Sequence, residues 1–346
     1  MRDADAAGEP VLVLGGGSNL VVADEGFPGT VIHVATRGVR ITADAGAAAV
    51  AVAAGEDWDA LVERCAVERL SGVECLSGIP GLAGATPIQN VGAYGQEVSE
   101  TITAVRVYDR LLDTIAELGN ADCGFGYRTS AFKRGATGSA AAGPRAAASP
   151  RAAAEPAAAT GRYVVLGVTF RLWRDPLSAP VRYGELARAL GVAEGERVPL
   201  ADARSAVLAL RRSKGMVLDP DDSDTRSAGS FFTNPVLDRR QFADLERRAA
   251  TRSGGPAHTV RVPHFAAPGD QVKVPAAWLI EQAGFGKGYP RGGAARISSK
   301  HTLALVNAGG ASTAGLVGLA REIRDGVRYA FGVELVTEPV LVGTQL

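Results

Sequence analysis

Apolar runs alternate with glycine-rich breaks in the first part of the chain. Residues 11–14 (VLVL) predict a buried strand, which ends at a run of glycines before a second short apolar run. Residues 48–55 (AAVAVAAG) predict another strand. Asp57 then occupies the position of a helix N-cap, because leucines and valines recur after it at helical spacing. Strand and helix therefore alternate from the start.

The same patterning predicts the later elements. Extended apolar segments alternate there with amphipathic ones, and the order favours an α+β fold over a single doubly wound parallel sheet. A domain boundary is expected near residue 212. The strands are expected at 103–108, 163–172 and 303–307, the helices at 201–212, 276–283 and 312–331, and a last extended stretch at 332–343.

Residues 135–161 differ in character from the rest of the chain. They are rich in alanine, carry scattered prolines and show no apolar periodicity. Such a segment cannot bury enough apolar surface to offset the entropy of ordering it. We expect a disordered surface insertion between two ordered strands.

Composition and charge narrow the function classes. The chain has 346 residues, of which 46% are hydrophobic, enough for two or three globular units. Its 37 Lys and Arg balance its 37 Asp and Glu, so no general cationic field favours nucleic acid or an anionic membrane surface. Three cysteines without CxxC spacing, and a polar start in place of a signal sequence or a spanning segment, indicate a cytoplasmic protein.

Two glycine-rich segments are candidate cofactor loops. Residues 15–19 (GGGSN) offer consecutive backbone N–H groups that suit a pyrophosphate, although a plain tight turn explains the loop equally well. They are not a nicotinamide Rossmann fingerprint, because residues 24–26 interrupt any long helix soon afterwards. Residues 75–97 contain several more glycines, and the two segments together suggest a dinucleotide, with a glycine-rich packing corner as the alternative.

Three residues stand out as candidates for chemistry. Arg128 lies in the run Tyr-Arg-Thr-Ser (127–130), just after two glycines, and could hold a carboxylate through paired N–H bonds. Ser230 lies between Gly229 and two phenylalanines, without the GxSxG elbow of a serine hydrolase. Glu338 precedes a proline at the end of a predicted strand, where composition alone favours a solvated terminus over a catalytic acid.

Metal chemistry lacks its usual ligand spacings. The four histidines form neither HxxxH nor HExxH, so no zinc site is expected; they are His33, His258, His264 and His301. The acidic run at 219–224 lacks the central glycine and distal glutamate of a calcium loop. We assign no metal.

Several of these segments, taken in order, resemble one family. The chain is similar to the UDP-N-acetylenolpyruvoylglucosamine reductases, flavoenzymes of peptidoglycan precursor synthesis, in their actinobacterial form. The resemblance extends over nearly the whole chain. It rests on LGGGSNLVVAD (14–24), SGIPGLAGATPIQNVGAYGQE (77–97), GYRTSAFK (126–133), RYGEL (182–186), SKGMVLDP (213–220), AGSFFTNP (228–235), AAWLIEQAGFGKG (276–288) and TEPVLVG (337–343).

The resemblance implies a domain organisation. It predicts a two-part FAD-binding region of the vanillyl-alcohol-oxidase (PCMH) type followed by a C-terminal α+β substrate-binding domain. We expect the first FAD subdomain at 1–35 with 336–346, the second at 36–211, and the UDP-sugar domain at 212–335. The insertion at 135–161 would leave the motifs on either side of it intact.

The resemblance also assigns residues to roles. Arg128, Ser230 and Glu338 match the family's catalytic residues, and Tyr183 matches a tyrosine on a lid over the sugar nucleotide. The residues that match substrate-binding positions are Tyr94, Tyr183, Lys214, Asn234 and Gln282. Those expected to bind FAD are Gly15, Gly16, Gly17, Ser18, Asn19, Ile79, Pro80, Gly84, Ala85, Thr86, Ile88, Gly92 and Ala93.

The reaction that follows is reduction of UDP-N-acetylglucosamine enolpyruvate to UDP-N-acetylmuramate, with NADPH reducing FAD first. Hydride from flavin N5 would attack the terminal carbon of the alkene, and Ser230 would protonate the other carbon. We expect a monomer with no nucleic-acid or membrane partner. Only about ten residues precede VLVL, whereas the family has a further strand-helix unit there. The alternative is therefore a non-catalytic UDP-sugar or nucleotide-binding protein with a compromised FAD site.

Overall fold

The computed structural model describes residues 1–134, 161–252 and 261–346. The predicted insertion therefore lies outside the described residues, except for Gly161. The chain forms two compact units: unit 1 is Met1–Gly17 with Phe27–Arg212, and unit 2 is Ser18–Gly26 with Ser213–Leu346.

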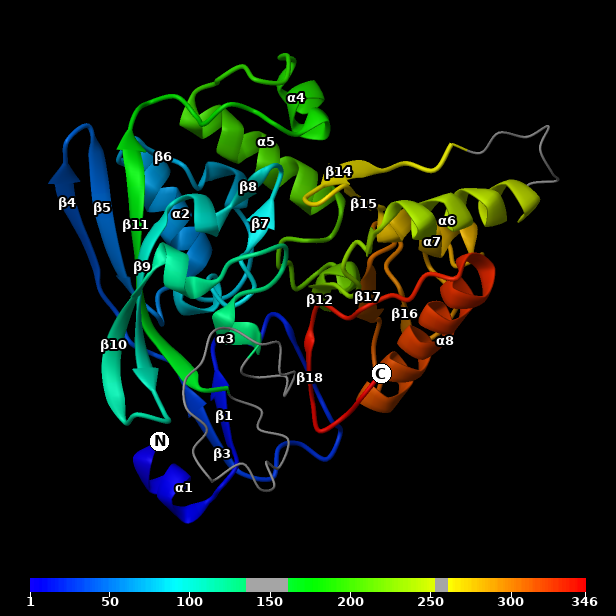
Figure 1. The fold of residues 1–346 in the computed structure, drawn as a ribbon, viewed down its shortest axis with the longest axis horizontal. Helices are drawn as coiled ribbons and strands as arrows, with labels where there is room; N and C mark the ends of the chain where they lie inside the picture. Colours follow the sequence, from blue (N-terminus) through cyan, green and yellow to red (C-terminus); the bar gives the residue numbers. More distant parts are fainter. Residues whose placement is uncertain (135–160, 253–260) are drawn as a thin grey trace. The chain divides into compact units, whose positions relative to one another are not determined.

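Unit 1 is built on an antiparallel sheet of six strands. Their order is β10-β9-β11-β5-β4, and β6 also pairs with β11. The strand β11 is central because one edge pairs with β5 and the other with β9 and, farther along, with β6 (Figure 1). The bounds are β4 Val39–Asp44, β5 Ala47–Ala53, β6 Leu70–Ser71, β9 Ile102–Asp109, β10 Thr114–Gly119 and β11 Tyr163–Arg174.

The helix α2, Trp58–Val67, shares its hydrophobic core with this sheet. It begins where the sequence predicts, because the Asp57 side chain accepts a hydrogen bond from Ala60 N at 2.8 Å and caps the first turn. Trp58 packs on Phe170 of β11 with ring centroids 5.7 Å apart. The indole also donates to the carbonyl of Leu76 at 3.1 Å, so this buried ring leaves no polar atom unpaired.

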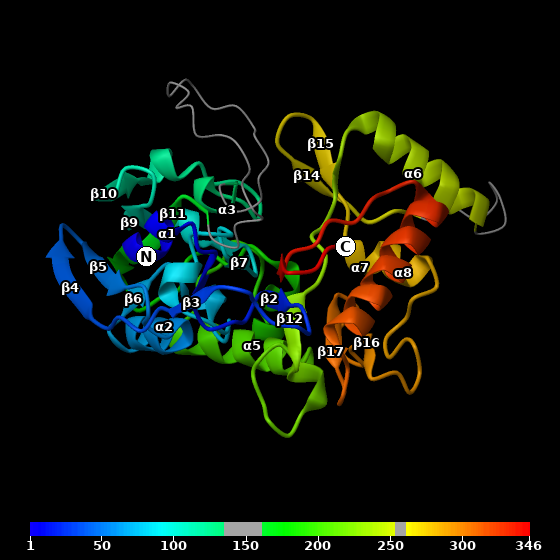
Figure 2. The same ribbon diagram turned by 90° about the horizontal axis from the view of Figure 1, so that it is seen from below.

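Smaller elements complete unit 1. Strands β1 and β3 pair in parallel, and β7 and β8 form a short antiparallel hairpin. Figure 2 shows α5 beside α2. The bounds are α1 Arg2–Ala7, β1 Val11–Leu14, β3 Thr30–His33, η1 Glu74–Leu76, η2 Ala83–Ala85, β7 Gly92–Ala93, β8 Gln96–Glu97, η3 Val98–Glu100, η4 Asn120–Cys123, α3 Ala131–Arg134, α4 Gly184–Leu190 and α5 Leu200–Ser213.

The described residues of unit 2 form three small sheets. Two are antiparallel, in the orders β12-β17-β16 and β13-β15-β14, and the third is the parallel pair β18-β2. The bounds are β2 Leu20–Val22, η5 Ser223–Thr225, β12 Ser227–Ser230, β13 Val236–Leu237, β14 Phe265–Ala267, β15 Gln271–Lys273, β16 Ala295–Ile297, β17 Ala304–Asn307 and β18 Val340–Val342.

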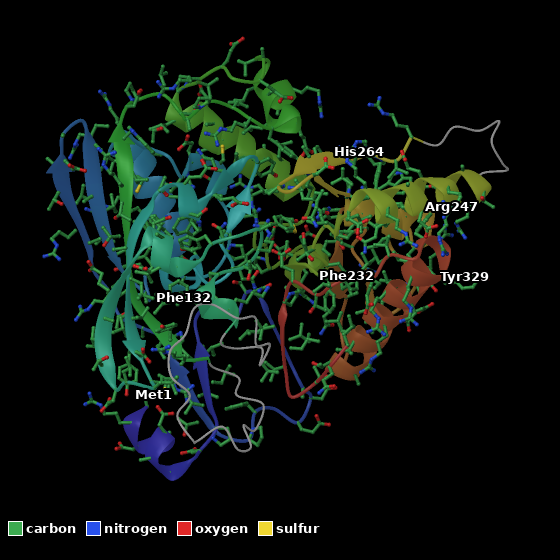
Figure 3. All side chains as sticks on the ribbon, in the orientation of Figure 1. Met1, Phe132, Phe232, Arg247, His264 and Tyr329 are labelled. Carbon is green, nitrogen blue, oxygen red and sulfur yellow. The ribbon has the colours of Figure 1, made fainter. Side chains whose placement is uncertain are left out.

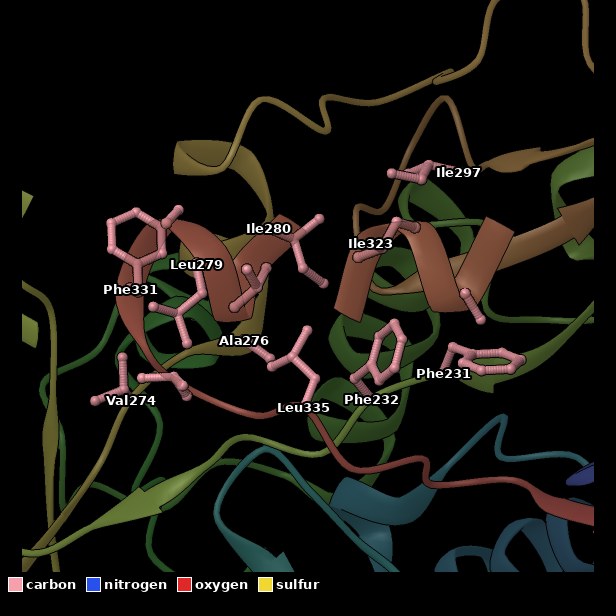
Figure 4. Close-up of a cluster of buried hydrophobic side chains, with 14 of the residues drawn as sticks. Phe231, Phe232, Val274, Ala276, Leu279, Ile280, Ile297, Ile323, Phe331 and Leu335 are labelled. Carbon is pink, nitrogen blue, oxygen red and sulfur yellow. The ribbon is translucent and has the colours of Figure 1, made fainter. Parts of the chain in front are cut away.

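In the part of unit 2 that the structure describes, three α-helices contribute side chains to the core: α6 Arg239–Arg252, α7 Ala276–Gln282 and α8 Thr313–Phe331. Figure 4 shows Phe231 and Phe232 in this core with side chains of α7 and α8. Both phenylalanines are 1% exposed, and their rings meet edge to face at 5.2 Å. The chain just after Ser230 is therefore anchored by two buried rings. Tyr329, labelled in Figure 3, lies by contrast on the exposed side of α8.

All three cysteines are free and buried in unit 1. Burial raises the pKa of the Cys65 thiol to about 12 and that of Cys123 to about 11. Burial also raises the pKa of Cys75. Each thiol therefore stays protonated at neutral pH.

The patterning locates the long apolar elements well and the short or polar ones poorly. The strand expected at 163–172 is β11, and the helix expected at 312–331 is α8. The helix α6 was missed because its face is mostly charged, with Leu245 and Ala249 its buried residues. The last stretch is a strand only at Val340–Val342. The segment before residue 135 is the helix α3, so the expected strand on that side of the insertion is wrong.

A close contact within unit 2 gives a stability prediction. A Cβ atom on Gly326 of α8 would lie 2.4 Å from Cε2 of Phe285, whose ring packs edge to face on Tyr289. We expect Gly326→Val to displace this ring and to lower the free energy of unfolding by about 2–3 kcal/mol. Chemical denaturation measures this change in the free energy of unfolding.

Gly318 offers a matched control on the same helix. A Cβ atom there would meet nothing within 4 Å. Gly318→Val should therefore stay within about 0.5 kcal/mol of the parent. If both variants lost the same free energy of unfolding, the cause would be valine within helix α8 and not the contact with Phe285.

Candidate functional site

The two glycine segments meet within unit 1. Gly16 follows β1, and a Cβ atom there would lie 2.9 Å from Cα of Gly81 in the second segment. Only glycine permits this approach of one backbone to the other. Gly16 and Gly17 are exposed, and across residues 1–134, 161–252 and 261–346 their N–H groups meet no acceptor. Two free, adjacent N–H groups are the donor set that a pyrophosphate needs.

Hydrogen bonds hold the second glycine segment (75–97) in place within unit 1 at several points. Asp59 of α2 accepts a hydrogen bond from Gly78 N at 2.6 Å and binds Arg204 of α5 through both carboxylate oxygens, at 2.6 and 3.0 Å. Burial opposes ionisation of Asp59, but these bonds outweigh it and hold its pKa below the ordinary value. Farther on, Gly84 N donates to Ala54 O at 2.9 Å. The segment is therefore a fixed scaffold.

The other predicted FAD residues lie along the same segment. Ile79, Pro80 and Ile88 are half-buried and Ala85 is exposed, whereas Gly84 and Thr86 are buried. The Thr86 hydroxyl donates to Ala83 O at 2.8 Å, so its role in this structure is local. Gly92 and Ala93 form β7.

Arg128 occupies a strained turn in unit 1. Gly126 and Thr129 exchange two backbone hydrogen bonds, at 3.0 and 3.2 Å, and enclose Tyr127 and Arg128. Arg128 has φ of 53°, a left-handed conformation that costs a non-glycine residue about 1–2 kcal/mol. Its Nη2 donates to Gly92 O at 2.7 Å. Such strain persists where the surroundings enforce it, and it is common at functional sites.

Tyr94 and Tyr183, two predicted substrate residues, contact each other in unit 1. Their rings meet edge to face with centroids 5.7 Å apart. Burial raises the pKa of Tyr94 to about 12 and also raises that of Tyr183, so both phenols stay protonated at neutral pH. Tyr94 has φ of 48°, and it is therefore a second strained residue beside the hairpin β7–β8.

Ser230 and Glu338 are brought together in unit 2 by backbone pairing. Glu338 N donates to Phe231 O at 2.9 Å, and Thr233 N donates to Val336 O at 3.0 Å. The segment carrying Glu338 therefore runs antiparallel to the one that follows Ser230. In β12 the register with β17 shifts between Ser227 and Ser230, and Gly229 in this bulge has φ of 76°. Bulges of this kind re-aim the neighbouring side chain.

The first glycine loop contributes directly to this arrangement. Asn19 belongs to unit 2, and its Nδ2 donates to Glu338 O at 3.3 Å. Val340 N donates in turn to Asn19 O at 3.0 Å. Ser18, the other predicted FAD residue of this loop, is half-buried in the same unit. The backbone of Glu338 is therefore held on both sides.

The remaining predicted substrate residues also belong to unit 2. Asn234 Oδ1 accepts a hydrogen bond from Ala276 N at 2.9 Å and so holds the start of α7. Gln282 is exposed at the end of that helix, and Lys214 is half-buried just after α5. The predicted residues thus fall into two groups, with Lys214, Asn234, Gln282, Ser230 and Glu338 in one unit and Arg128, Tyr94 and Tyr183 in the other.

Sequence reasoning gave no role to two residues that support the site. Asp59 lies on a helix that the periodicity predicts, but nothing in the sequence links it to Gly78 or Arg204. Asn90 lies inside the NVGAYG motif and has φ of 45°, a conformation that asparagine tolerates better than most residues. The sequence signal for this backbone conformation was an asparagine in a glycine-rich motif.

The described residues show neither a metal centre nor a membrane-spanning helix. No cluster of three His, Cys, Asp or Glu side chains is arranged to hold a metal ion there. Within the same part of the chain, no helix has the length and apolar character needed to cross a bilayer.

Comparison with known proteins identifies the family. The family model described as "UDP-N-acetylenolpyruvoylglucosamine reductase, C-terminal domain" matches residues 219–342, and that described as "FAD binding domain" matches residues 1–113. A UDP-N-acetylenolpyruvoylglucosamine reductase of Thermobifida fusca is 54% identical over 100% of this chain and 89% of its own length. The chain belongs to the UDP-N-acetylenolpyruvoylglucosamine reductase family.

Other members of the reductase family give the same result. The Streptomyces coelicolor relative of that name is 54% identical over 100% of this chain and 82% of its own length. A crystal structure of the Thermus caldophilus reductase has a TM-score of 0.54 at 22% identity, and the match covers 99% of this chain and 90% of that one. At that identity the likeness supports the fold alone.

Family membership confirms the fold class expected from the sequence. The chain is an α+β protein with a PCMH-type FAD-binding domain and the C-terminal domain of this reductase family. The FAD-domain match includes both glycine segments. The close backbone approach at Gly16 and the exposed N–H groups beside it fit FAD as the cofactor.

This fit gives a direct prediction for Gly16. A methyl group at this position would force the backbone of Gly81 to move, because nothing flexible lies between them. We expect Gly16→Ala to weaken FAD binding by tenfold or more, roughly 1.4 kcal/mol, while the protein stays folded. Titration of the flavin-free protein with FAD measures the dissociation constant.

Gly119→Ala serves as the control in the same unit. A Cβ atom on Gly119 would meet only Asp122 Oδ2, at 3.5 Å. FAD affinity should be unchanged in this variant. Wild-type affinity in Gly16→Ala would show that the contact between the two glycine segments does not shape the cofactor site.

Proposed function

We propose that the protein reduces UDP-N-acetylglucosamine enolpyruvate to UDP-N-acetylmuramate, with NADPH as the reductant. The observation that supports this best is the backbone pairing that sets Glu338 beside the segment of Ser230. This pairing places the backbone of Glu338 next to the residue after Ser230, although more than one hundred residues separate the two in sequence. A hydroxyl group and a carboxyl group on neighbouring segments suit the addition of hydrogen across an alkene that carries a carboxylate.

The chemistry assigns a task to each residue. FAD, when bound, supplies at N5 the hydride that it receives from NADPH. As hydride reaches the terminal carbon of the alkene, negative charge spreads from the neighbouring carbon into the substrate carboxylate. Arg128 binds this carboxylate through paired N–H bonds, and Glu338 contacts it with a shared proton, which avoids repulsion between two carboxylates.

Ser230 completes the addition by donating its hydroxyl proton to the carbon next to the carboxylate. A hydroxyl is a weak acid, but an enolate-like carbon is a strong base, and general acid catalysis of this kind contributes about 10²–10⁴-fold. One hydride and one proton thus add across the double bond. The serine afterwards regains a proton from water.

The substrate residues and the domains have matching proposed roles. Lys214, Asn234 and Gln282 would bind the diphosphate and sugar of the substrate, with Tyr94 and Tyr183 packing on its rings. We assign 1–35 with 336–346 and 36–211 to FAD binding, and 212–335 to the UDP-sugar. The proposed FAD contacts come from Gly15, Gly16, Gly17, Ser18, Asn19, Ile79, Pro80, Gly84, Ala85, Thr86, Ile88, Gly92 and Ala93. We further propose a cytoplasmic monomer.

A single titration tests this proposal against a binding protein without redox activity. The purified protein is loaded with FAD, reduced anaerobically with NADPH, and then mixed with the enolpyruvyl sugar nucleotide. We expect flavin absorbance to bleach with NADPH and to return with the substrate. A protein that binds UDP but takes up no FAD, or a reduced flavin that the substrate leaves unchanged, would exclude the reductase.

Ser230→Ala separates the proton donor from the rest of the site. NADPH should still bleach the flavin at nearly the wild-type rate, while reoxidation by the substrate should fall by about 10²–10⁴-fold. Stopped-flow absorbance measures both half-reactions. Ser230→Cys is the matched control, because its thiol keeps an exchangeable proton and should retain more reoxidation. If both half-reactions slow equally in Ser230→Ala, the serine is not the proton donor.

A further inference from the structure

The buried side-chain amide of Asn90 makes three hydrogen bonds within unit 1. The residue is 1% exposed, has φ of 45°, and lies two residues before the first residue of the hairpin β7–β8. Its Nδ2 donates to Glu97 Oε2 at 2.7 Å and to Gly126 O at 3.1 Å, and its Oδ1 accepts from Ser99 N at 3.1 Å. A buried amide with three partners fixes whatever it joins.

The partners of Asn90 lie on two different segments. Glu97 and Ser99 belong to the hairpin and the turn after it, whereas Gly126 is the first residue of the turn that carries Arg128. Asn90 therefore fastens the Arg128 turn to the hairpin from the base of that turn.

Arg128 makes the second connection between the same segments. Its Nη2 donates to Gly92 O, two residues after Asn90. A Cβ atom on Gly92 would lie 3.3 Å from Nη1 of Arg128 and 2.8 Å from Cγ of Glu97, so the guanidinium passes close over a bare backbone. The turn is thus held at its base by the amide and at its tip by the arginine.

This double attachment accounts for the left-handed conformation of Arg128. A non-glycine residue keeps such a conformation only where neighbouring bonds outweigh the preference to relax. The bond from Asn90 reaches Gly126, the first residue of that turn, and Lys133 Nζ donates to the carbonyl oxygen of Arg128 itself at 3.4 Å.

We propose that Asn90 is a positioning residue for Arg128. It holds the turn so that the guanidinium is fixed in place before the substrate carboxylate arrives. The inference rests on the proposed function, because it uses the role assigned to Arg128 there. A purely structural role for Asn90 would instead affect stability and both half-reactions together.

Asn90→Gly is the sharpest variant. Glycine adopts positive φ without cost, so the backbone is kept while all three side-chain bonds are lost. We expect NADPH to bleach the flavin within about twofold of the wild-type rate. Reoxidation by the enolpyruvyl sugar nucleotide should slow by about 10- to 100-fold, because misplacement of a substrate-binding group by about 1 Å has an effect of that size.

Asn120→Ala is the matched control. Asn120 also bridges backbone carbonyls through Nδ2, to Ser99 O at 2.9 Å and Ile102 O at 2.8 Å, but it does not touch the Arg128 turn. The ratio of its two half-reaction rates should stay at the wild-type value. Asn90→Asp is a second variant, since aspartate tolerates the conformation but cannot donate to Gly126 O.

A double-mutant cycle with Arg128→Lys tests the connection. If Asn90 acts through Arg128, Asn90→Gly should slow reoxidation by no more than about twofold in the Arg128→Lys background. The same slowing in both backgrounds, normal reoxidation in Asn90→Gly, or loss of the folded flavoprotein in both Asn90 variants would overturn the proposal. Failure of the wild-type protein to reoxidise would instead reject the proposed function itself.

Discussion

The arrangement of unit 2 depends on backbone hydrogen bonds that its C-terminal segment makes to two other segments of the chain. Residues 336–338 pair with the chain that follows Ser230, and β18 then pairs in parallel with β2. The C-terminal segment thus lies between backbone partners that are about 100 and 320 residues away in sequence. Because each contact is a main-chain hydrogen bond, the position of Glu338 depends on strand geometry more than on its own side chain.

Unit 1 positions its candidate groups in a different way. It places glycine where two backbones must approach, at Gly16 and Gly92, and it tolerates left-handed conformations at Asn90, Tyr94 and Arg128. Each left-handed residue lies where hydrogen bonds or ring packing enforce the local backbone. A rigid sheet with the buried Trp58 and Phe170 at its core provides the support that such strain requires.

Local sequence signals predicted the elements that local physics determines. Asp57 caps α2 as its side chain predicts, and the apolar run at β11, rich in β-branched and aromatic residues, forms a strand paired on both edges. Composition favoured a solvated terminus for Glu338, since nothing near it in sequence indicates a partner. Its actual environment comes from Phe231 and Asn19, which no pattern within a short window can supply.

The motifs predicted the family, which the comparisons then confirmed, but not the contacts between motifs. The resemblance to the family assigned a role to Arg128 but none to Asn90, although both residues lie in segments on which the resemblance rests. Likewise, periodicity predicted α2 and α5 as helices, but the bridge from Asp59 to Arg204 joins two helix faces whose meeting depends on the folded chain. Side-chain hydrogen bonds between segments far apart in sequence can be identified only from the folded structure.

The buried, protonated cysteines have a practical consequence for spectroscopy. Alkylating dyes and spin labels attack thiolates that solvent can reach, and Cys65, Cys75 and Cys123 meet neither condition at neutral pH. One cysteine introduced on the surface of each unit would consequently accept a fluorophore without removal of the native thiols. Distance measurements by energy transfer could then follow the two units through turnover in an otherwise unaltered protein.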